Sequence, residues 1–367
     1  MAKKNFDYVI VGGGMSGCLM AKALSRLGNP SIALIEASSN IGPWNASNPY
    51  GIGSDEISFL PAESSSERAL EFVENLLGHS IERHTVEQPP LTVEKGQLQP
   101  FFGFGEKVPA EVDELMPYLA PQRIEASPHP SRWFSLLRET LPAEVFTRSQ
   151  VTKIEVEQGR AKSVTVNGDQ RIEGQCFIIC VPPTELSKLL PAAAIDPKVS
   201  QKLSKSKLWT SVSLDLVHER ELGPEGTMHI IQGGESSVCL GQFRKTHTGH
   251  HISQWMSFIS GEEFDEEATA SVLRELKRLI KKAYPEALEK LQLERIVVRP
   301  NSHGTISLKL EEDFSLPGIE NLWLCSSLLR AEKNLVGSIL QVQRVASSIQ
   351  RVVSNVMEDD GTAEVGK

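Results

Sequence analysis

The start of the chain consists of two apolar runs separated by a segment with helical spacing. Residues 6–11 (FDYVIV) are apolar and β-branched, which is typical of a buried strand, and glycines follow them. Apolar residues then recur at helical spacing through 15–27, and Gly28 is expected to cap that helix. Residues 31–36 (SIALIE) form a second apolar run. This order predicts a strand–helix–strand unit with two parallel, fully buried strands.

Short strands dominate the middle of the chain. Residues 151–157, 162–168, 171–174 and 176–183 are predicted to form four short strands, and Asn167-Gly168 is a hairpin signal between the second and third. Four later segments alternate apolar and polar residues with a period of two, which predicts an antiparallel sheet with one covered face: 210–217, 227–232, 237–243 and 251–259.

The remaining pattern is mainly helical. Helical spacing is present in four segments: 66–78, 132–141, 266–284 and 334–356. Further strands are expected at 293–300 and 319–327. Residues 38–64 are rich in Ser, Asn, Pro and Gly, and 88–130 hold many of the prolines, so a loop and irregular structure are expected there.

A parallel start and an isolated strand–helix pair at the end enclose an antiparallel middle. Two discontinuous domains explain this order better than two consecutive ones. The first domain is predicted to contain residues 1–60, 130–185 and 315–357. The second is predicted to contain residues 61–129 and 186–314, and the polar residues 358–367 are expected to be a disordered tail.

Charge and cysteine content narrow the classes of function. The chain has 38 Lys and Arg against 47 Asp and Glu, and this net charge of -9 argues against a nucleic-acid partner. No apolar run approaches the ~20 residues of a transmembrane helix, and the N-terminus lacks a secretory signal. The five cysteines include no CxxC pair, which indicates reduced thiols, a cytoplasmic location and no metal site.

The glycine run after the first strand has the G-x-G-x-x-G pattern of a dinucleotide-binding turn. Gly12 permits the tight turn, Gly14 lets the backbone approach a pyrophosphate, and Gly17 allows close packing of helix on strand. The N-terminus of the helix supplies free N–H groups to the diphosphate. The predicted cofactor-binding residues of this turn are Gly12, Gly13, Gly14, Met15, Ser16 and Gly17.

Glu36 ends the second strand, 19 positions after Gly17. Its carboxylate can accept hydrogen bonds from both ribose hydroxyls, and this suits NAD and FAD equally. No second G-x-G-x-x-G occurs, because Gly103-Phe104-Gly105 is followed by Val108 where the third glycine would be. A separate nicotinamide domain is therefore not predicted.

Three segments resemble the superfamily of FAD-dependent amine oxidases, protoporphyrinogen oxidases and phytoene desaturases. They are DYVIVGGGMSGCLMAKAL with ALIEAS and Ile41-Gly42, VTKIEVE with CFIICVPPTELSKLL, and GIENLWLCSSLL with VGSILQVQRVASSI. The resemblance implies an α/β fold, with a discontinuous Rossmann-type FAD-binding domain and an α+β substrate domain on an antiparallel sheet. It also implies cofactor contacts from Ala37, Gly42, Trp44, Val151, Ser326, Ser327, Gly337, Ser338 and Ile339. The Val151 backbone would pair with the adenine edge, and the backbone of 337–339 would face the flavin.

Two motifs depart from the superfamily pattern. Gly42-Pro43-Trp44 stands in place of Gly-Gly-Arg, and Ser326-Ser327 in place of the closing Gly-Asp. A neutral Ser327 would bind FAD more weakly than the usual aspartate. The closing helix contains no cysteine, so a non-covalent FAD is expected.

The function that follows is an FAD-dependent oxidoreductase acting on a small-molecule substrate. It would take a hydride from a C–H or C–N centre of a small, largely apolar substrate, and the flavin would be reoxidised by oxygen or another acceptor. The alternatives are an FAD-binding protein without redox turnover and a non-redox flavin mutase, for which Arg244 and Arg330 are the candidate diphosphate ligands. His303 is a candidate for the active site, but no catalytic residue is assigned. The substrate, electron acceptor and oligomeric state are left open.

Overall fold

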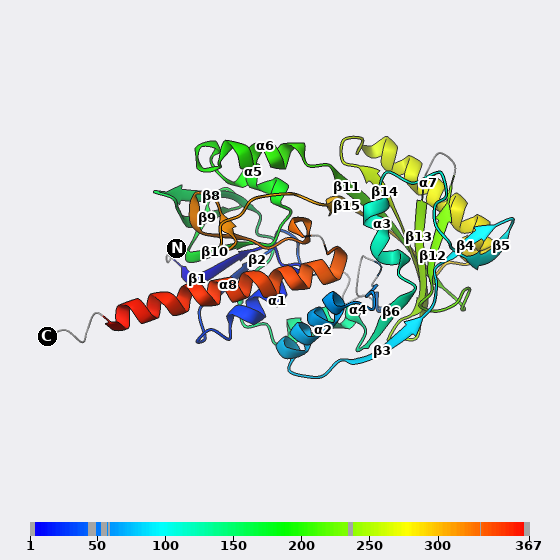
Figure 1. The fold of residues 1–367 in the computed structure, drawn as a ribbon, viewed down its shortest axis with the longest axis horizontal. Coiled ribbons are helices and arrows are strands. Elements are labelled where there is room, and N and C mark those ends of the chain that lie inside the picture. Colours follow the sequence, from blue (N-terminus) through cyan, green and yellow to red (C-terminus); the bar gives the residue numbers. More distant parts are fainter. Residues whose placement is uncertain are drawn as a thin grey trace.

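The computed structural model describes residues 4–42, 49–52, 57, 59–233, 238–330 and 332–362, with the side chains of residue 131 and of those after 352 left out. Two large sheets lie side by side along the molecule, as Figure 1 shows. The first has the strand order β16-β17-β10-β1-β2-β7, and a β8–β9 hairpin pairs with β10. Its strands are β1 (Asn5–Val11), β2 (Ile32–Ile35), β7 (Glu144–Phe146), β8 (Val151–Glu157), β9 (Arg160–Val166), β10 (Gln170–Ile179), β16 (Ser315–Leu316) and β17 (Ile319–Leu324).

The predicted strand–helix–strand start is confirmed. β1 runs parallel to β2, and α1 (Met15–Leu24) connects them. Alternate residues of β1 enter two different hydrophobic clusters, with Ile10 facing one side of the sheet and Val9 the other. Burial on both faces explains why these strands are apolar throughout.

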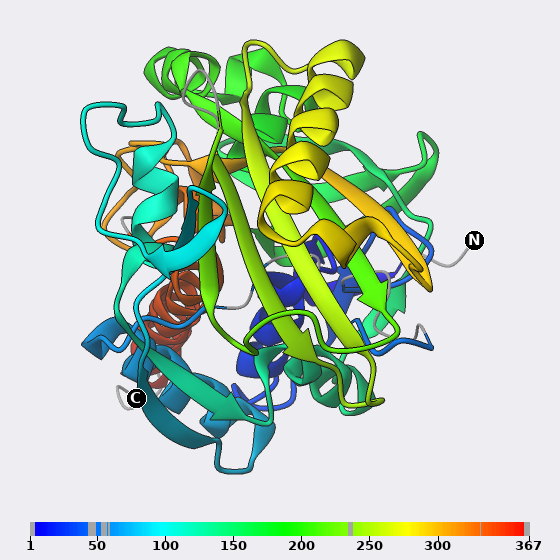
Figure 2. The same cartoon turned by 90° about the vertical axis from the view of Figure 1, so that its right-hand side faces the viewer.

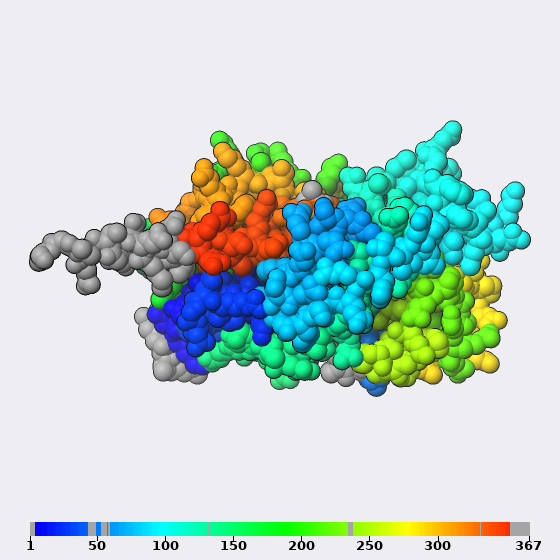
Figure 3. Space-filling model, turned by 60° about the horizontal axis from the view of Figure 1, so that its bottom comes forward, coloured from blue at the N-terminus to red at the C-terminus, as the bar shows by residue number. Residues whose placement is uncertain are grey.

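Helices cover both faces of the first sheet. On one face lie α1, α2 (Ser64–Leu77), α4 (Pro130–Glu139) and α8 (Asn334–Thr362), which share a cluster with Ile10. In Figure 3 the surfaces of α1, α2 and α8 adjoin. On the other face, α5 (Leu186–Leu189) and α6 (Pro197–Lys205) pack with Val9.

The second sheet has the order β15-β11-β14-β13-β12-β4-β5. The helix α7 (Glu266–Ala283) covers one face, as Figure 2 shows, and its Leu276 and Ile280 pack on Val212 and Trp255. The predicted antiparallel pairing of the four strands is confirmed. The expectation of one covered face is wrong, because successive residues of β11, β13 and β14 are buried and both faces of the sheet are covered. The strands are β4 (Leu91–Glu94), β5 (Gln97–Pro100), β11 (Leu208–His218), β12 (Met228–Gln232), β13 (Val238–Lys245), β14 (His251–Ser260) and β15 (Leu293–Gly304).

Three local predictions need correction. The segment 88–130, expected to be irregular, contains β4, β5, α3 (Val112–Leu115) and β6 (Gln122–Ser127). The expected strand 171–174 and the first part of the expected strand 176–183 form the single strand β10, because Gln175 continues the strand between them. Gly28 does not cap α1, whose C-cap is Ser25; its φ of +90° instead lets the chain turn toward β2.

Two local turn signals are confirmed. Asn167 and Gly168 have φ of +53° and +87°, which are the signs that a type I′ hairpin between β9 and β10 requires. Gly78 caps α2 in the left-handed conformation with φ of +77°.

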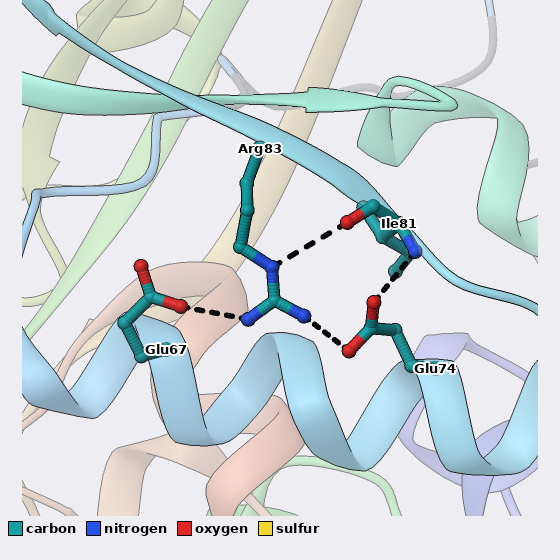
Figure 4. Close-up of polar contacts among 4 residues, drawn as sticks. All are labelled: Glu67, Glu74, Ile81 and Arg83. Carbon is teal, nitrogen blue, oxygen red and sulfur yellow. Dashed lines mark hydrogen bonds and ion pairs between the residues drawn. The ribbon is translucent and has the colours of Figure 1, made fainter.

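The strand β3 (Glu82–Glu87) pairs with β6 and is tied back to α2 (Figure 4). The Arg83 guanidinium donates to Glu67 Oε2 at 2.7 Å and also bonds Glu74 Oε2. Glu74 Oε1 in turn accepts from the Ile81 N–H at 2.6 Å. Arg83 therefore links two turns of α2 to β3, the strand that follows this helix in the chain.

The division into two discontinuous domains stays a prediction. Packing favours one change to it, because α2 and residues 186–203 contribute to the clusters of the first sheet, although the sequence placed both segments in the second domain. The helix α8 runs to Thr362, so the expected tail 358–367 begins within a helix, and 363–367 lie outside the described residues.

Candidate functional site

The predicted cofactor residues follow parallel strands that end at one edge of the first sheet. Gly12 follows β1, Glu36 follows β2, and Ser326 lies two residues after β17. The Gly12 N–H donates to the Ile35 carbonyl at 2.8 Å, which holds the first two strand ends together. Ligands of open α/β sheets bind beyond the carboxyl ends of the strands, so this edge is the candidate site.

The glycine turn leaves its centre open. Gly12 has φ of +105°, and a Cβ at Gly17 would lie 2.0 Å from the Gly12 carbonyl oxygen, so both positions need glycine for the turn itself. A Cβ at Gly14 would have no atom within 4 Å. Gly14 precedes α1 without a side-chain cap, so the first N–H groups of the helix, at Met15, Ser16 and Gly17, have no acceptor within the helix.

The Glu36 carboxylate is hydrogen-bonded to the glycine turn and to Ser38. Its Oε2 accepts from the Gly13 N–H at 2.7 Å, and its Oε1 accepts from the Ser38 N–H and Oγ–H, both at 2.8 Å. A carboxylate has about four acceptor positions, so one remains for a ribose hydroxyl. Binding of ribose by Glu36 stays a prediction, as does a contact from the exposed Ala37 beside it.

The loop after β2 returns to the glycine turn at Gly42. Its N–H donates to the Gly13 carbonyl at 2.7 Å, and its φ is +80°. A Cβ at Gly42 would lie 1.9 Å from the Phe134 ring of α4, so glycine is needed for this close approach. Trp44 lies outside the described residues.

Val151 begins β8 and lies near the end of β2. The Ser149 N–H, two residues earlier, donates to the Glu36 carbonyl at 2.9 Å, and the Arg148 N–H donates to the Ser38 carbonyl at 2.7 Å. These bonds bring the chain before β8 to the predicted ribose end of the site. The adenine contact from Val151 remains a prediction. The location of Val151 beside the predicted ribose site favours it.

The free N–H groups at the N-terminus of α8 belong to other residues than the sequence predicted for the flavin contact. The Gly337 N–H donates to the Lys333 carbonyl at 3.0 Å, and the side chain of Ile339 is buried in the core. The N–H groups that this helix leaves without a helical acceptor therefore belong to residues 334–336. The contacts predicted for Gly337, Ser338 and Ile339 remain predictions, and the geometry favours donors from the preceding turn.

A polar cavity of about 40 Å³ lies between the closing segment and the end of β15. Ser327 and Ser338, both predicted from the sequence, line it together with His303. The sequence did not indicate two further residues, Glu114 of α3 and Lys333, whose Nζ lies 3.1 Å from Glu114 Oε1. Lys333 Nζ also donates to the Gly304 carbonyl at 2.8 Å.

A second cavity, of about 300 Å³, lies between the second sheet and the segment that joins β6 to α4. Its charged or titratable lining residues are Arg123, Glu125, His129, Glu225, Arg244 and Lys245. Arg330 is not part of this lining and pairs with Glu332 at 2.6 Å. The two arginines proposed as diphosphate ligands therefore do not line one cavity.

Trp255 packs in the core beneath α7 and donates its Nε1–H to Ser253 Oγ at 2.8 Å. His250 and His251 lie at the turn between β13 and β14. Among the residues that the structure describes, no three His, Cys, Asp or Glu side chains are grouped to hold a metal ion. In the same residues no helix is both long and apolar enough to cross a membrane.

A family model described as DAO, FAD dependent oxidoreductase, matches residues 7–328. The chain belongs to this family. Its cofactor is accordingly FAD, and the protein is an FAD-dependent oxidoreductase. No curated protein matches the chain.

Solved structures share the fold of this FAD-dependent oxidoreductase. An oxidoreductase from Methanosarcina mazei has 11% identity and a TM-score of 0.68, over 93% of this chain and 100% of that one. A putrescine oxidase triple mutant has 17% identity and a TM-score of 0.64, over 95% and 99%. Cyclohexylamine oxidase from Brevibacterium oxydans has 12% identity and a TM-score of 0.62, over 95% and 99%. Identities this low show a common fold and leave the substrate open.

The edge of the first sheet fits the nucleotide half of FAD. The uncapped N-terminus of α1 and the empty space at Gly14 suit a pyrophosphate, and Glu36 keeps an acceptor for ribose. The closing segment has a neutral Ser327 where the superfamily has an aspartate. A serine cannot form the charge-assisted hydrogen bonds that an aspartate would form with the cofactor.

Proposed function

We propose that this FAD-dependent oxidoreductase dehydrogenates a small substrate at a C–N or C–H centre. The open N-terminus of α1 at Gly14 is the observation that carries the proposal, because an uncapped helix start beside open space suits a pyrophosphate. The names of two structures with the same fold, putrescine oxidase and cyclohexylamine oxidase, favour a C–N centre. FAD, when bound, accepts the hydride, and oxygen or another acceptor then takes the electrons.

The cavity beneath the second sheet supports a small substrate but not a largely apolar one. Its volume of about 300 Å³ suits a small molecule. Six of its lining residues are charged or titratable: Arg123, Glu125, His129, Glu225, Arg244 and Lys245. A substrate with a polar group therefore fits this lining better than a hydrocarbon does.

Anaerobic reduction of the bound flavin tests this function. The purified protein is loaded with FAD and titrated with candidate amines, polyenes and porphyrinogens, while the flavin absorption band is followed. Bleaching by an amine, reversed by air or an added acceptor, is the expected result. A flavin that dithionite bleaches but none of the candidate substrates bleaches would favour the alternative of an FAD-binding protein without redox turnover.

A further inference from the structure

A third cavity, of about 490 Å³, lies between α7 and the strands β13 and β14. Val272, Leu276 and Leu279 of α7 line it, and their spacing places them on one face of the helix. Cys239 of β13 and Ser257 of β14 line the opposite side. The volume suits a small organic molecule, and the helix offers an apolar wall for it.

A buried carboxylate, that of Glu111, also lines this cavity. Glu111 directly precedes α3, and the residue is 8% exposed. Among the residues that the structure describes, no cationic side chain pairs with this carboxylate, which accepts a hydrogen bond from its own backbone N–H. Glutamate is rarely buried to this extent without a partner, because its carboxylate loses hydration when it is buried. The position of Glu111 therefore requires a reason.

The titration of Glu111 agrees with a missing counter-ion. Burial raises the pKa of Glu111, and the hydrogen bond from its own N–H opposes this shift without cancelling it. A cation in contact with the carboxylate would lower the pKa instead. The carboxylate is thus held beside a cavity that contains nothing from the described chain to balance its charge.

The other two charged residues of the lining neutralise each other. Glu275 accepts from Arg278 twice, with Oε2 at 2.7 Å from Nε and Oε1 at 2.6 Å from Nη2. Such a bidentate pair is among the strongest that side chains form. Two carboxylates and one guanidinium leave one negative charge in the lining, and that charge belongs to Glu111.

The second buried polar group of the cavity also offers an acceptor. Ser257 is 7% exposed, and its hydroxyl donates to the Val238 carbonyl at 2.7 Å. Because its only O–H is already used, the Ser257 oxygen can only accept from a ligand. The two buried polar groups of the cavity, Glu111 and Ser257, therefore both match a donor, and the net charge of the lining matches a monocation.

We propose that this cavity binds a primary ammonium ligand with an apolar body, and that Glu111 is its anionic partner. The ammonium group has three N–H donors and would donate to Glu111 and Ser257, while its apolar body lies against Val272 and Leu276 of α7. None of the described cofactor-site residues lines this cavity, so the ligand would bind away from the flavin. The proposal goes beyond the proposed dehydrogenation and does not depend on it.

Calorimetric titration of the FAD-loaded, full-length protein with three probes tests the site. Cumylammonium has a primary ammonium group on an aromatic body, and no hydrogen on the carbon beside nitrogen, so the flavin cannot dehydrogenate it. Cumyl alcohol is its neutral isostere, and Ca²⁺ is a cation without an apolar body. We expect cumylammonium to bind at least about tenfold more tightly than cumyl alcohol, because a charge-assisted hydrogen bond is roughly twice as strong as a neutral one. Equal binding of the two, no binding of cumylammonium, or tighter binding of Ca²⁺ would overturn the proposal.

Two variants locate the binding. Glu111→Gln should lose the preference for cumylammonium, while the unfolding temperature of the free protein stays unchanged or rises, because an unpaired buried charge is removed. Ser271→Phe keeps every charge but fills the cavity from an exposed position of α7, so it should weaken binding of both organic probes. Glu289→Gln is the control, since Glu289 is exposed between α7 and β15 and is not part of the lining. It should bind cumylammonium like the parent.

Contrary results in these variants would have clear meanings. A Glu111→Gln protein that binds cumylammonium like the parent would show that the ammonium group lies elsewhere. A Glu111→Gln protein that unfolds at a lower temperature would show that Glu111 is a structural residue. If Glu111→Gln does not fold, Ser271→Phe decides, because undiminished binding in that variant would exclude this cavity.

The flavin absorption band separates this cavity from the active site. The band should stay unchanged while cumylammonium binds. A change of the band that follows the binding curve would place the ligand at the flavin and overturn the proposal. Since no turnover is measured, a flavin that no amine bleaches would contradict the proposed dehydrogenation and leave this site intact. Bleaching by amines without selective cumylammonium binding would do the opposite.

Discussion

At the residue scale, the glycines of the first turn differ in what a side chain would meet. Gly12 has a positive φ, and a Cβ at Gly17 would overlap the Gly12 carbonyl. Gly14 has an ordinary φ of -72° and open space at its Cβ position. A substitution at Gly14 therefore separates cofactor binding from folding.

We expect Gly14→Val to fold normally and to lose bound FAD. The valine side chain would occupy the space that a pyrophosphate needs, and its Cβ would have no protein atom within 4 Å. Flavin absorbance after gel filtration measures occupancy, and thermal unfolding measures stability. Gly17→Val is the matched control and should destabilise the fold itself. Full flavin occupancy in Gly14→Val would show that the turn does not face the cofactor.

Ser327 offers a second test at this scale. It lines the polar cavity beside Lys333, where the superfamily has an aspartate. We expect Ser327→Asp to bind FAD about tenfold more tightly, because a charged acceptor makes stronger hydrogen bonds than a neutral one. Titration of FAD into flavin-free parent and variant measures the two dissociation constants. Unchanged affinity would place position 327 outside the flavin site.

At the element scale, the Arg83 contacts hold β3 against α2. The hydrogen bond from Arg83 holds the pKa of Glu74 below its ordinary value, so the ionised carboxylate stabilises the fold. This contribution is fully present above the pKa of an unfolded glutamate, near 4.3, and is lost as pH falls through the lower folded value.

We expect Glu74→Gln to lower the free energy of unfolding by about 1 kcal/mol at pH 7, a small value because the pair is partly exposed. The difference from the parent should shrink as the pH falls below about 4.3, where unfolded Glu74 becomes protonated, and should disappear once the folded carboxylate is protonated as well. Urea unfolding at several pH values measures both effects. A difference that is constant with pH would mean that the Glu74 charge does not contribute.

At the scale of the whole molecule, a buried ion pair joins the two parts. Glu114 comes from α3, which packs with the second sheet, and Lys333 comes directly before α8 of the first. Their side chains are 4% and 11% exposed. A charge left alone at such a position is expensive, whereas replacing both charges by apolar groups is often tolerated.

We expect Lys333→Met to lower the free energy of unfolding by about 3 kcal/mol, because Glu114 then lacks its ionic partner. The double variant Lys333→Met with Glu114→Leu should recover more than half of this loss. Denaturant unfolding of the flavin-free proteins keeps cofactor effects out of the comparison. Additive losses in the double variant would show that the two side chains act independently.

Much of the fold could be predicted because its signals are local. The run FDYVIV, the glycines after it and the spacing in 15–27 specify β1, the turn and α1 within a few residues of one another. Asn167-Gly168 specifies a hairpin for the same reason. The prediction was wrong for 88–130, because β4 and β6 are stabilised by distant strands rather than by their own pattern.

The sequence by itself determined that the glycine turn and Glu36 meet, since Gly12 to Gly17 and Glu36 are separated by one helix and one strand. Only the tertiary structure decided which charged residues line the cavity beside the second sheet. Arg244, His129 and Arg123 line one cavity only because β13 packs opposite β6 and the start of α4. Gly241 must be glycine because the Trp255 ring of the neighbouring strand would lie 2.0 Å from its Cβ. Such contacts depend on how sheets and helices pack across large separations in the chain, and no short-range periodicity records that packing.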